Sequence, residues 1–247
     1  MLSVDRALNQ ILSNAKRIVE TEVVPLKVAN GRVLAKDITA QMSMPPFDQS
    51  AMDGYAVKFD EIPTSKSMPL KQRVPAGQAP SEHIPNSAAR IFTGAAIPRG
   101  ADCVIIQENV EATKESIRLE GEFTLGQNIR LQGSEVNKGD LILAAGTRLN
   151  PFLVGICATH GLAEIPVFKK LRVGVMSTGD ELLEPGMPLG LGKIYNSSRF
   201  MLQGLVESIG MEFIDLGIVS DSHNETVAAI SQACDTCDVL LTTGGVS

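Results

Sequence analysis

Apolar residues recur at helical spacing near the start of the chain. They stand at Val4, Ala7, Leu8, Ile11 and Leu12. This i, i+3, i+4, i+7 pattern predicts an amphipathic helix, and Ser3 directly before it is a suitable N-cap. Because one side of such a helix is apolar, we expect it to pack against a part of the chain distant in sequence.

The pattern shortens after this helix and then changes texture. Residues 22–39 predict a strand, a turn at Asn30-Gly31 and a further short strand or helix. Residues 40–139 hold most of the thirteen prolines and several short alternating runs, such as 103–107 and 116–119. Short runs separated by Gly, Pro and Asn are typical of small all-β domains, so we predict an inserted β-rich module here.

From Leu171 onward, buried strands alternate with helices. Continuous apolar runs at 171–176, 213–219 and 239–243 predict strands, and helix-periodic segments lie between them at 199–209 and 225–233. This alternation favours βαβ units and a doubly wound parallel sheet. Ligands bind such sheets at the carboxyl ends of the strands.

Composition narrows the class of protein. The chain has 247 residues, 44% of them hydrophobic, and a net charge of −6, which suits a multidomain globular protein with sizeable cores. It has no run of basic residues, so nucleic acid and anionic membrane surfaces are excluded as partners. No apolar run approaches the ~20 residues that span a bilayer, and the N-terminus has no apolar signal core, so we expect a cytoplasmic protein without a membrane segment.

The four cysteines are too sparse for a secreted disulfide scaffold, which agrees with the expected compartment. Cys234 and Cys237 form a C-x-x-C pair, but no second pair and no histidine lies near them in the sequence. We interpret them as thiols at a helix end rather than as a metal or redox site.

Polar residues gather in a short loop that two adjacent prolines introduce. Residues 45–57 include Asp48, Ser50 and Asp53 together with an amide and a glycine. The prolines restrict the backbone, and binding groups concentrate on loops held by a rigid scaffold. We therefore predict that this loop presents its carboxylates and hydroxyl to a ligand.

A second set of polar and glycine residues follows the predicted parallel strands. It comprises Thr178, Asp180, Glu181, Asp221, Gly244, Gly245 and Ser247. The acidic pair 180–181 is typical of a site for a cation or for donor groups of a ligand, although Asp180 is also a candidate cap of a following helix. The glycine pair suits close approach of an anion to backbone N–H groups, and a plain turn is an equally good interpretation.

Two further motifs lie inside the β-rich region. Thr93-Gly94 is interpreted as a turn that aims a hydroxyl at a phosphate. Arg130 and Glu135 flank Gly133, and the arginine has two equally good partners on this evidence, a phosphate or Glu135 itself.

Together these motifs resemble the MoeA family of molybdopterin molybdenumtransferases, which includes a domain of the scaffold protein gephyrin. The resemblance rests on the strings at 47–56, 93–95, 126–130, 133–135, 146–147, 177–182 and 244–247, which follow the family's order along the whole chain. The string Ser-Ala-Met-Asp-Gly-Tyr-Ala, residues 50–56, is the most specific of them.

The resemblance implies three domains. Residues 1–20 and 171–247 would belong to a MoaB/Mog-like, doubly wound molybdopterin-binding α/β domain, present here as its N-terminal helix and first half. Residues 21–39 and 140–170 would form an extended connecting domain, and residues 40–139 the inserted β-rich domain. Family members continue beyond the point where this sequence stops, so we expect a fragment, whose three strands would leave an open sheet edge.

The resemblance also implies a reaction. Molybdenum from molybdate is inserted into adenylylated molybdopterin (molybdopterin-AMP) with release of AMP, in a homodimer whose active site lies between subunits. Molybdopterin adenylyltransferase is an expected partner and Mg²⁺ the expected metal. Asp53, Glu135 and Thr93 are carried over as catalytic residues, the first two also as metal ligands. The substrate-binding residues are then Ser50, Thr178, Asp180, Glu181, Asp221, Gly244, Gly245 and Ser247.

One departure and three alternatives remain at this point. Family members commonly have Gly-Glu-Asp where this chain has Gly-Ser-Glu at 133–135, so the acidic side chain is one methylene longer. A non-catalytic scaffold of the gephyrin type and an inactive fragment of the transferase are the alternative functions. Adenylyltransferase relatives lack the first ~170 residues, so the loop of Asp53 argues against them. The sequence does not decide between molybdate and tungstate.

Overall fold

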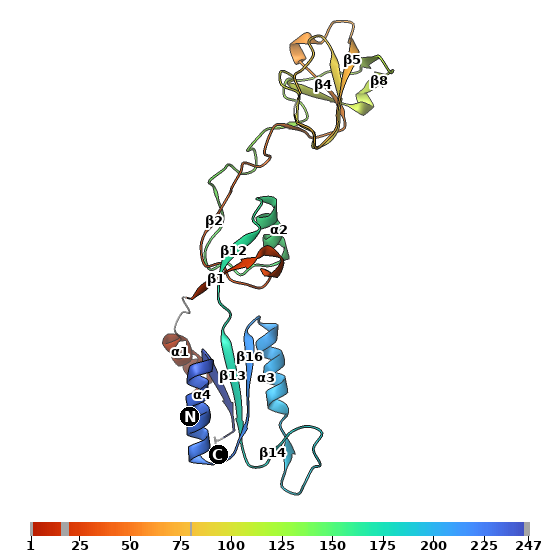
Figure 1. Cartoon of the computed structure of the whole chain (residues 1–247). Helices are drawn as coiled ribbons and strands as arrows, with labels where there is room; N and C mark the ends of the chain where they lie inside the picture. The colour runs from red at the N-terminus through yellow and green to blue at the C-terminus, as the bar shows by residue number, and fades with distance from the viewer. Residues whose placement is uncertain (1, 16–19, 80, 245–247) are drawn as a thin grey trace. The chain divides into compact units, whose positions relative to one another are not determined.

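The computed structural model describes residues 2–15, 20–79 and 81–244, and the chain forms two compact units (Figure 1). One unit comprises Met1–Asp37 and Leu143–Ser247, and the other is Ile38–Ile142. The second unit is built of strands and contains the whole region, residues 40–139, that was predicted to be β-rich. The division into three domains, with a separate connecting domain, stays a prediction.

The N-terminal helix forms where its periodicity predicts. Helix α1 spans Val4–Asn14, and the hydroxyl of its N-cap Ser3 accepts a hydrogen bond from the Arg6 N–H. None of its residues is buried, and Ile11 is 67% exposed. The packing partner expected for its apolar side is therefore not found among the described residues.

A small antiparallel layer follows. Strand β1, Thr21–Pro25, pairs along its whole length with β12, Glu164–Phe168. Between them in sequence lie the short helix η1, Leu26–Val28, and helix α2, Pro151–Thr159. The Asn150 side chain caps α2 and Pro151 occupies its first turn, where a missing N–H costs nothing. After the turn at residues 30–31, the segment predicted to be a further short strand or helix forms isolated β-bridges at Val33 and Leu34 rather than a full strand.

The C-terminal segment forms the predicted parallel sheet. Its elements are β13 (Arg172–Thr178), β14 (Leu182–Leu183), β15 (Ile194–Tyr195), α3 (Ser197–Ser208), β16 (Glu212–Val219), α4 (His223–Thr236) and β17 (Val239–Thr243). Strand β13 lies between β16 and β17, parallel to both. From β13 the chain passes through α3 to β16 at one edge of the sheet, and then through α4 to β17 at the other edge. Because such crossovers are right-handed, α3 and α4 lie on opposite faces of the sheet, as Figure 1 shows. The doubly wound parallel prediction is confirmed.

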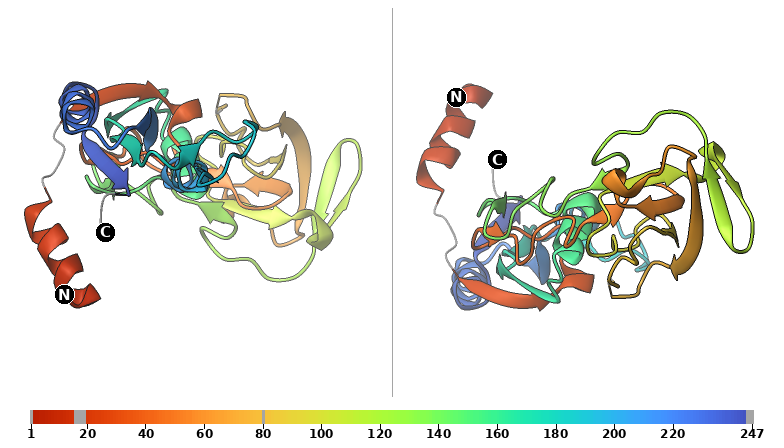
Figure 2. Two further views of the ribbon diagram at one scale, coloured as in Figure 1. Left: turned by 90° about the horizontal axis from the view of Figure 1, so that it is seen from below. Right: turned by 90° about the horizontal axis from the view of Figure 1, so that it is seen from above.

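The β-rich unit is centred on a mixed six-stranded sheet of order β7-β4-β6-β5-β9-β8. Its elements are β2 (Ile38–Thr39), β3 (Gln49–Ser50), β4 (Gly54–Val57), η2 (Phe59–Glu61), β5 (Ser67–Val74), β6 (Ala88–Ile91), β7 (Cys103–Ile106), η3 (Gln107–Asn109), β8 (Val110–Ala112), β9 (Ser116–Leu119), β10 (Ile129–Arg130) and β11 (Leu141–Leu143). Figure 2 shows the yellow-green hairpin of β8 and β9 against the curved strand β5.

This sheet curls, because its two edge strands are consecutive in sequence. Only the three residues of η3 separate β7 from β8, and three residues span at most about 11 Å, so the two edges approach each other. The inner strand β4 is covered on both sides. In β4, Tyr55 and Val57 join one hydrophobic cluster and Ala56 joins another, so the strand is buried on both sides. The loop before β4 is therefore joined to a rigidly packed strand.

The cysteines are all free thiols. Cys103 and Cys157 are buried, and burial raises the pKa of Cys103 to about 11, whereas Cys234 is exposed. Within residues 2–15, 20–79 and 81–244, no group of three or more His, Cys, Asp or Glu side chains is placed to hold a metal ion. No helix in the same residues has the length and apolar character needed to cross a membrane.

Candidate functional site

Asp53 lies in the loop between β3 and β4, where the turn after β6 meets it. One oxygen of its carboxylate, Oδ1, accepts hydrogen bonds from the Thr93 N–H and from the Thr93 hydroxyl, both at 2.8 Å. The Thr93 N–H, then its hydroxyl, lower the pKa of Asp53 below the ordinary value of 3.8. The structure therefore brings together two of the three residues predicted to be catalytic, forty positions apart in sequence.

Arg90 holds this loop from behind. Its guanidinium donates to the carbonyl oxygen of Gly54 at 2.9 Å and to Oε1 of Gln107 at 2.6 Å, and Gln107 N–H in turn donates to the Asp53 carbonyl at 3.1 Å. The same guanidinium lies over the rings of Tyr55 and Phe92. No local pattern in the sequence indicates this role of Arg90, because its place beside Tyr55 depends on the register of β4 and β6.

The other candidates of this unit are placed differently. Ser50 is buried, and its hydroxyl donates to the Met52 carbonyl, so it closes the loop. Asp48 accepts from the Gln132 N–H and fixes the loop to the segment that precedes Glu135. Glu135 is exposed, its N–H donates to the Met44 carbonyl, and no hydrogen bond among the described residues joins it to Asp53.

The structure corrects one of the two alternatives for Arg130, the ion pair with Glu135. Arg130 lies in β10, which pairs with β3, and in the described part of the chain no carboxylate lies within 4 Å of its guanidinium. A local ion pair with Glu135 is therefore not formed. The β10–β3 pairing holds Arg130 beside Gln49 instead.

A second group of candidates meets at the carboxyl edge of the parallel sheet. Asp180 Oδ1 accepts from the Asp221 N–H at 3.2 Å, and Asp221 Oδ2 accepts from the Asp180 N–H at 3.5 Å. Thr178 donates from its hydroxyl to the Thr243 carbonyl at 3.3 Å. These bonds tie the loops after all three strands together, as the predicted topology requires.

Asp180 does not cap a helix, because the chain continues from it into the short strand β14 rather than into a helix. The capping alternative is therefore wrong. The side chains of Asp180, Glu181 and Asp221 are all exposed. The carboxylate of Glu181 lies so close to Gly179 that a Cβ on this glycine would collide with it. Carboxylate oxygens therefore predominate among the described candidates of this edge, and such oxygens accept from N–H donors or bind a cation.

Gly244 fits closely against Thr178. A Cβ at Gly244 would lie 2.8 Å from the Thr178 hydroxyl oxygen and closer still to its carbonyl oxygen, and the backbone has φ +96°. Only glycine satisfies both conditions without strain, which explains the first glycine of the pair. Gly245 and Ser247 lie outside the described residues.

Asn196 is a buried polar residue at the same edge that the sequence analysis missed. Its Oδ1 caps helix α3 by accepting from the Arg199 N–H, and it also accepts from the buried Ser177 hydroxyl at 3.3 Å. Its Nδ2 is buried with no partner among the described residues. An Asn directly before a helix is a cap signature, and Asn196 directly precedes α3, so the cap was predictable, whereas its contact with Ser177 was not.

Two groups of candidate residues thus exist, one in each unit. In the β-rich unit, Asp53 Oδ1 is fully used by Thr93, and in the part of the chain that the structure describes no hydrogen bond reaches Oδ2. A carboxylate with one oxygen fixed and one free suits a hard cation that is held jointly with ligand phosphates. The edge of the α/β sheet instead offers several carboxylates and close backbone, which suits a ligand rich in N–H donors.

Comparison with known proteins gives the family. Residues 2–161 match the family described as the MoeA N-terminal region (domain I and II), and residues 174–247 match one described as a probable molybdopterin binding domain. The molybdopterin molybdenumtransferase of Haemophilus influenzae is 40% identical over 249 aligned residues, covering 100% of this chain and 62% of the relative. That of Bacillus subtilis is 38% identical over 256, covering 100% and 59%.

The fold agrees with these matches. The crystal structure of the molybdopterin biosynthesis MoeA protein from Pyrococcus horikoshii OT3 superposes with a TM-score of 0.88 at 36% identity, covering 100% of this chain and 67% of that one. The chain therefore spans about three fifths of the length of the curated relatives that it matches. Two consecutive family matches, close relatives and a shared fold lead to one conclusion: this chain belongs to the MoeA family.

Proposed function

We propose that this chain takes part in molybdenum cofactor biosynthesis, in the insertion of molybdenum from molybdate into adenylylated molybdopterin with release of AMP. The proposal is supported by curated relatives named molybdopterin molybdenumtransferase that align with the entire chain. The single structural observation that supports it most is the carboxylate of Asp53 held by Thr93 on a rigid loop.

Asp53 acts as a fixed negative charge. A carboxyl with the ordinary pKa of 3.8 is already ionised at neutral pH, and the bonds from Thr93 lower this pKa further, so Asp53 suits holding a cation or orienting a reacting group and does not suit donating a proton. Thr93 fixes the carboxylate by two hydrogen bonds, and Arg90 fixes the backbone on its C-terminal side. This preorganisation means that little rearrangement is needed when the ligand binds.

The donor chemistry fits Mg²⁺. This ion takes oxygen ligands and is commonly bound by one or two carboxylates together with substrate phosphates. In our proposal Asp53 Oδ2 and the carboxylate of Glu135 are the protein ligands. When bound, the ion would neutralise the charge of the adenylate linkage and make its phosphorus more electrophilic. Glu135 is the less constrained ligand, since its side chain is exposed.

The α/β edge would bind the pterin and adenylate part of the substrate. Pterin rings carry N–H donors, and the carboxylates of Asp180, Glu181 and Asp221 are acceptors. Thr178 and Gly244 bring backbone to the same edge. Gly245 and Ser247, which follow Gly244, are proposed to continue this surface.

We also propose a homodimer with the active site shared between subunits, a cytoplasmic location and molybdopterin adenylyltransferase as the source of the adenylylated substrate. These proposals rest on the resemblance to the family.

The test is molybdate-dependent AMP release by the purified protein from adenylylated molybdopterin. We expect Asp53→Asn to abolish release, because the amide cannot replace the fixed charge, and Asp60→Asn to leave it unchanged. Asp60 is the matched control, since it is exposed in η2 of the same unit. Unchanged release by Asp53→Asn would refute the role of Asp53. Binding of a partner peptide without any turnover by the wild type would favour the gephyrin-type scaffold.

A further inference from the structure

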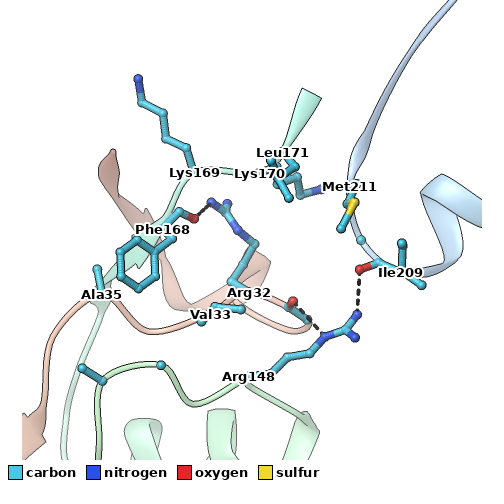
Figure 3. A pocket seen from close by; sticks show the side chains of 14 residues that line it. Arg32, Val33, Ala35, Arg148, Phe168, Lys169, Lys170, Leu171, Ile209 and Met211 are labelled. Atoms are coloured by element: carbon cyan, nitrogen blue, oxygen red, sulfur yellow. Dashed lines mark hydrogen bonds between the residues drawn. The ribbon is translucent and has the colours of Figure 1, made fainter. Parts of the chain in front are cut away.

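A crevice of about 610 Å³ lies within the unit Met1–Asp37 and Leu143–Ser247, apart from every candidate residue described above (Figure 3). Four segments form its walls: the turn after η1, the loop before α2, the end of β12 with the stretch leading to β13, and the turn after α3. Its volume falls within the ~300–1,000 Å³ of small-molecule sites. The residues that line it are Gly31, Arg32, Val33, Ala35, Ala145, Gly146, Arg148, Phe168, Lys169, Lys170, Leu171, Ile209, Gly210 and Met211.

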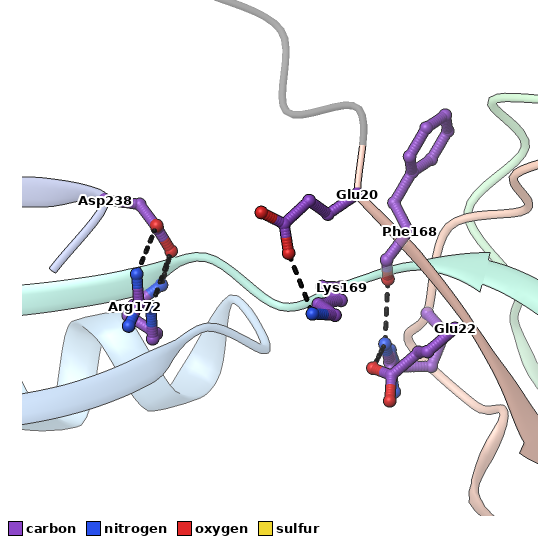
Figure 4. A network of polar contacts seen from close by, with 7 residues as sticks. Glu20, Glu22, Phe168, Lys169, Arg172 and Asp238 are labelled. Atoms are coloured by element: carbon purple, nitrogen blue, oxygen red, sulfur yellow. Dashed lines mark hydrogen bonds and ion pairs between the residues drawn. The ribbon is translucent and has the colours of Figure 1, made fainter. Parts of the chain in front are cut away.

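The lining is strongly cationic. It contains two arginines and two lysines and no acidic residue. Two of the four are neutralised by carboxylates outside the lining: Lys169 pairs with Glu20 at 2.8 Å, as Figure 4 shows, and Arg32 pairs with Glu22 at 2.5 Å. Lys169 also extends away from the other labelled side chains in Figure 3.

The other two cations have no carboxylate partner within 4 Å in the described part of the chain. Arg148 donates only to carbonyl oxygens, from Nη2 to Ile209 at 2.9 Å and from Nε to Gly31 at 3.4 Å. Hydrogen bonds to carbonyl oxygens orient the guanidinium but do not neutralise its positive charge. Its Nη1 has no partner among the described residues. Lys170 is exposed and makes no ion pair in the same residues. Two positive charges therefore remain in one concave surface, which concentrates their potential.

The rest of the lining is apolar. Val33, Ala35, Phe168, Leu171, Ile209 and Met211 supply side chains, and three glycines leave the backbone bare. Apolar walls with a few placed polar groups are the usual lining of sites for organic molecules, whereas sites for bare ions are polar throughout. The crevice therefore suits a molecule with an anionic end and an apolar body.

We propose that this crevice binds a small organic phosphate monoester, with its phosphate held by Arg148 and Lys170 and its apolar body against the wall of Phe168, Leu171 and Met211. Charge selects this class, because a phosphate monoester carries about −1.5 to −2 at neutral pH and two uncompensated cations face it. Arginine also matches phosphate geometry in a two-pronged contact. The site is independent of the proposed function, since it shares no lining residue with either group of candidates.

The test uses three probes with the whole chain: phenyl phosphate, inorganic phosphate and phenol, each titrated while the backbone amides are followed by NMR. We expect phenyl phosphate to bind best and to shift the amides of Gly31, Gly146 and Gly210, which line the crevice. Equal binding of phenol would overturn the role of the cations. Equal binding of inorganic phosphate would overturn the role of the apolar wall. The absence of these shifts, or shifts only around Thr178 and Gly244, would overturn the site.

Variants separate a specific site from a general charge effect. Lys170→Gln removes a free charge without breaking a hydrogen bond or ion pair of the described residues, and we expect it to weaken phenyl phosphate binding about 10- to 30-fold, as loss of one charge about 4 Å in water from a phosphate of about −1.5 to −2 implies. Arg148→Lys keeps the charge and loses the fork, so it should weaken binding less than Arg148→Gln. Lys27→Gln, an exposed lysine of η1 outside the crevice, is the matched control. An equal loss with Lys27→Gln would overturn the proposal.

Discussion

Gly54, the residue after Asp53, is predicted to be irreplaceable even by alanine. It lies in β4 opposite Ile106 of β7 on one side and opposite Ile91 of β6 on the other. An ideal Cβ at this position would lie 2.9 Å from the carbonyl carbon of Ile105 and 3.2 Å from Cα of Ile106, with the Ile105 carbonyl oxygen nearer still. Every one of these neighbours is backbone, so no side chain can rotate away.

The magnitude follows from these distances. Carbon atoms prefer separations of about 3.5–4.0 Å, so β4 and β7 must move apart by roughly half an ångström or more. Overpacking of a tight interior costs about 1–3 kcal/mol. Each ladder bond that the movement weakens contributes about 1 kcal/mol. We therefore expect Gly54→Ala to destabilise the β-rich unit by about 2–4 kcal/mol.

Amide hydrogen exchange of β4 and β7 measures this change within the intact chain. A loss of that size speeds exchange roughly 30- to 1,000-fold where exchange requires opening of the unit. Gly77→Ala is the control, because Gly77 has φ +85° and open space around it, so it tests backbone strain without a clash. Exchange in Gly54→Ala no faster than in Gly77→Ala would refute the reasoning. Gln107 directly follows β7 and donates from its N–H to the Asp53 carbonyl, so a movement of β7 should also displace the loop of Asp53. This displacement is the second expected result.

Three further predictions concern single groups. Thr93→Val should raise the pKa of Asp53 toward 3.8, whereas Thr93→Ser should not, and the ¹³C shift of the Asp53 side-chain carboxyl carbon measures this pKa. Because the pKa is lowered in the folded state, the ionised carboxylate stabilises the fold above its ordinary pKa. This stabilisation is lost as pH falls through the lowered value. Arg90→Gln should lower the urea midpoint of the β-rich unit by the equivalent of about 1–3 kcal/mol, since it breaks charge-assisted bonds, and an unchanged midpoint would contradict the clamp. Iodoacetamide at pH 8 should label exposed Cys234 and spare Cys103, whose pKa is about 11, until the chain is unfolded; rapid labelling of native Cys103 would show that the core opens.

The elements of the α/β segment were predictable because their signals are local. Strand β13 is buried on both faces and reads as a continuous apolar run, and α3 follows an Asn cap with helical periodicity. Boundaries differ by only a few residues: the helix predicted at 225–233 spans His223–Thr236. The β-rich unit was predictable in kind, but its strand order was not, because short strands carry no information about partners.

The candidate residues show the same difference between local signals in the sequence and contacts made by distant segments. The resemblance named Asp53 and Thr93, yet their contact arises because the turn after β6 returns to the loop before β4. Arg130 and Glu135 are five positions apart, and proximity in sequence suggested an ion pair, but in the described part of the chain no carboxylate lies within 4 Å of the Arg130 guanidinium. Arg90 and Asn196 carried only weak local signals and emerged through partners far away in the chain.

The sequence by itself therefore determined the kinds of element, the division into a β-rich and an α/β part, and the family, because periodic burial and specific strings are properties of consecutive residues. Only the tertiary structure decided which polar groups meet. Strand register puts Arg90 behind Gly54, the crossovers bring Thr178 against Gly244, and the packing of one unit gathers Arg148 and Lys170 into a crevice. These contacts join residues tens of positions apart, and their free energy depends on the whole arrangement rather than on any local pattern.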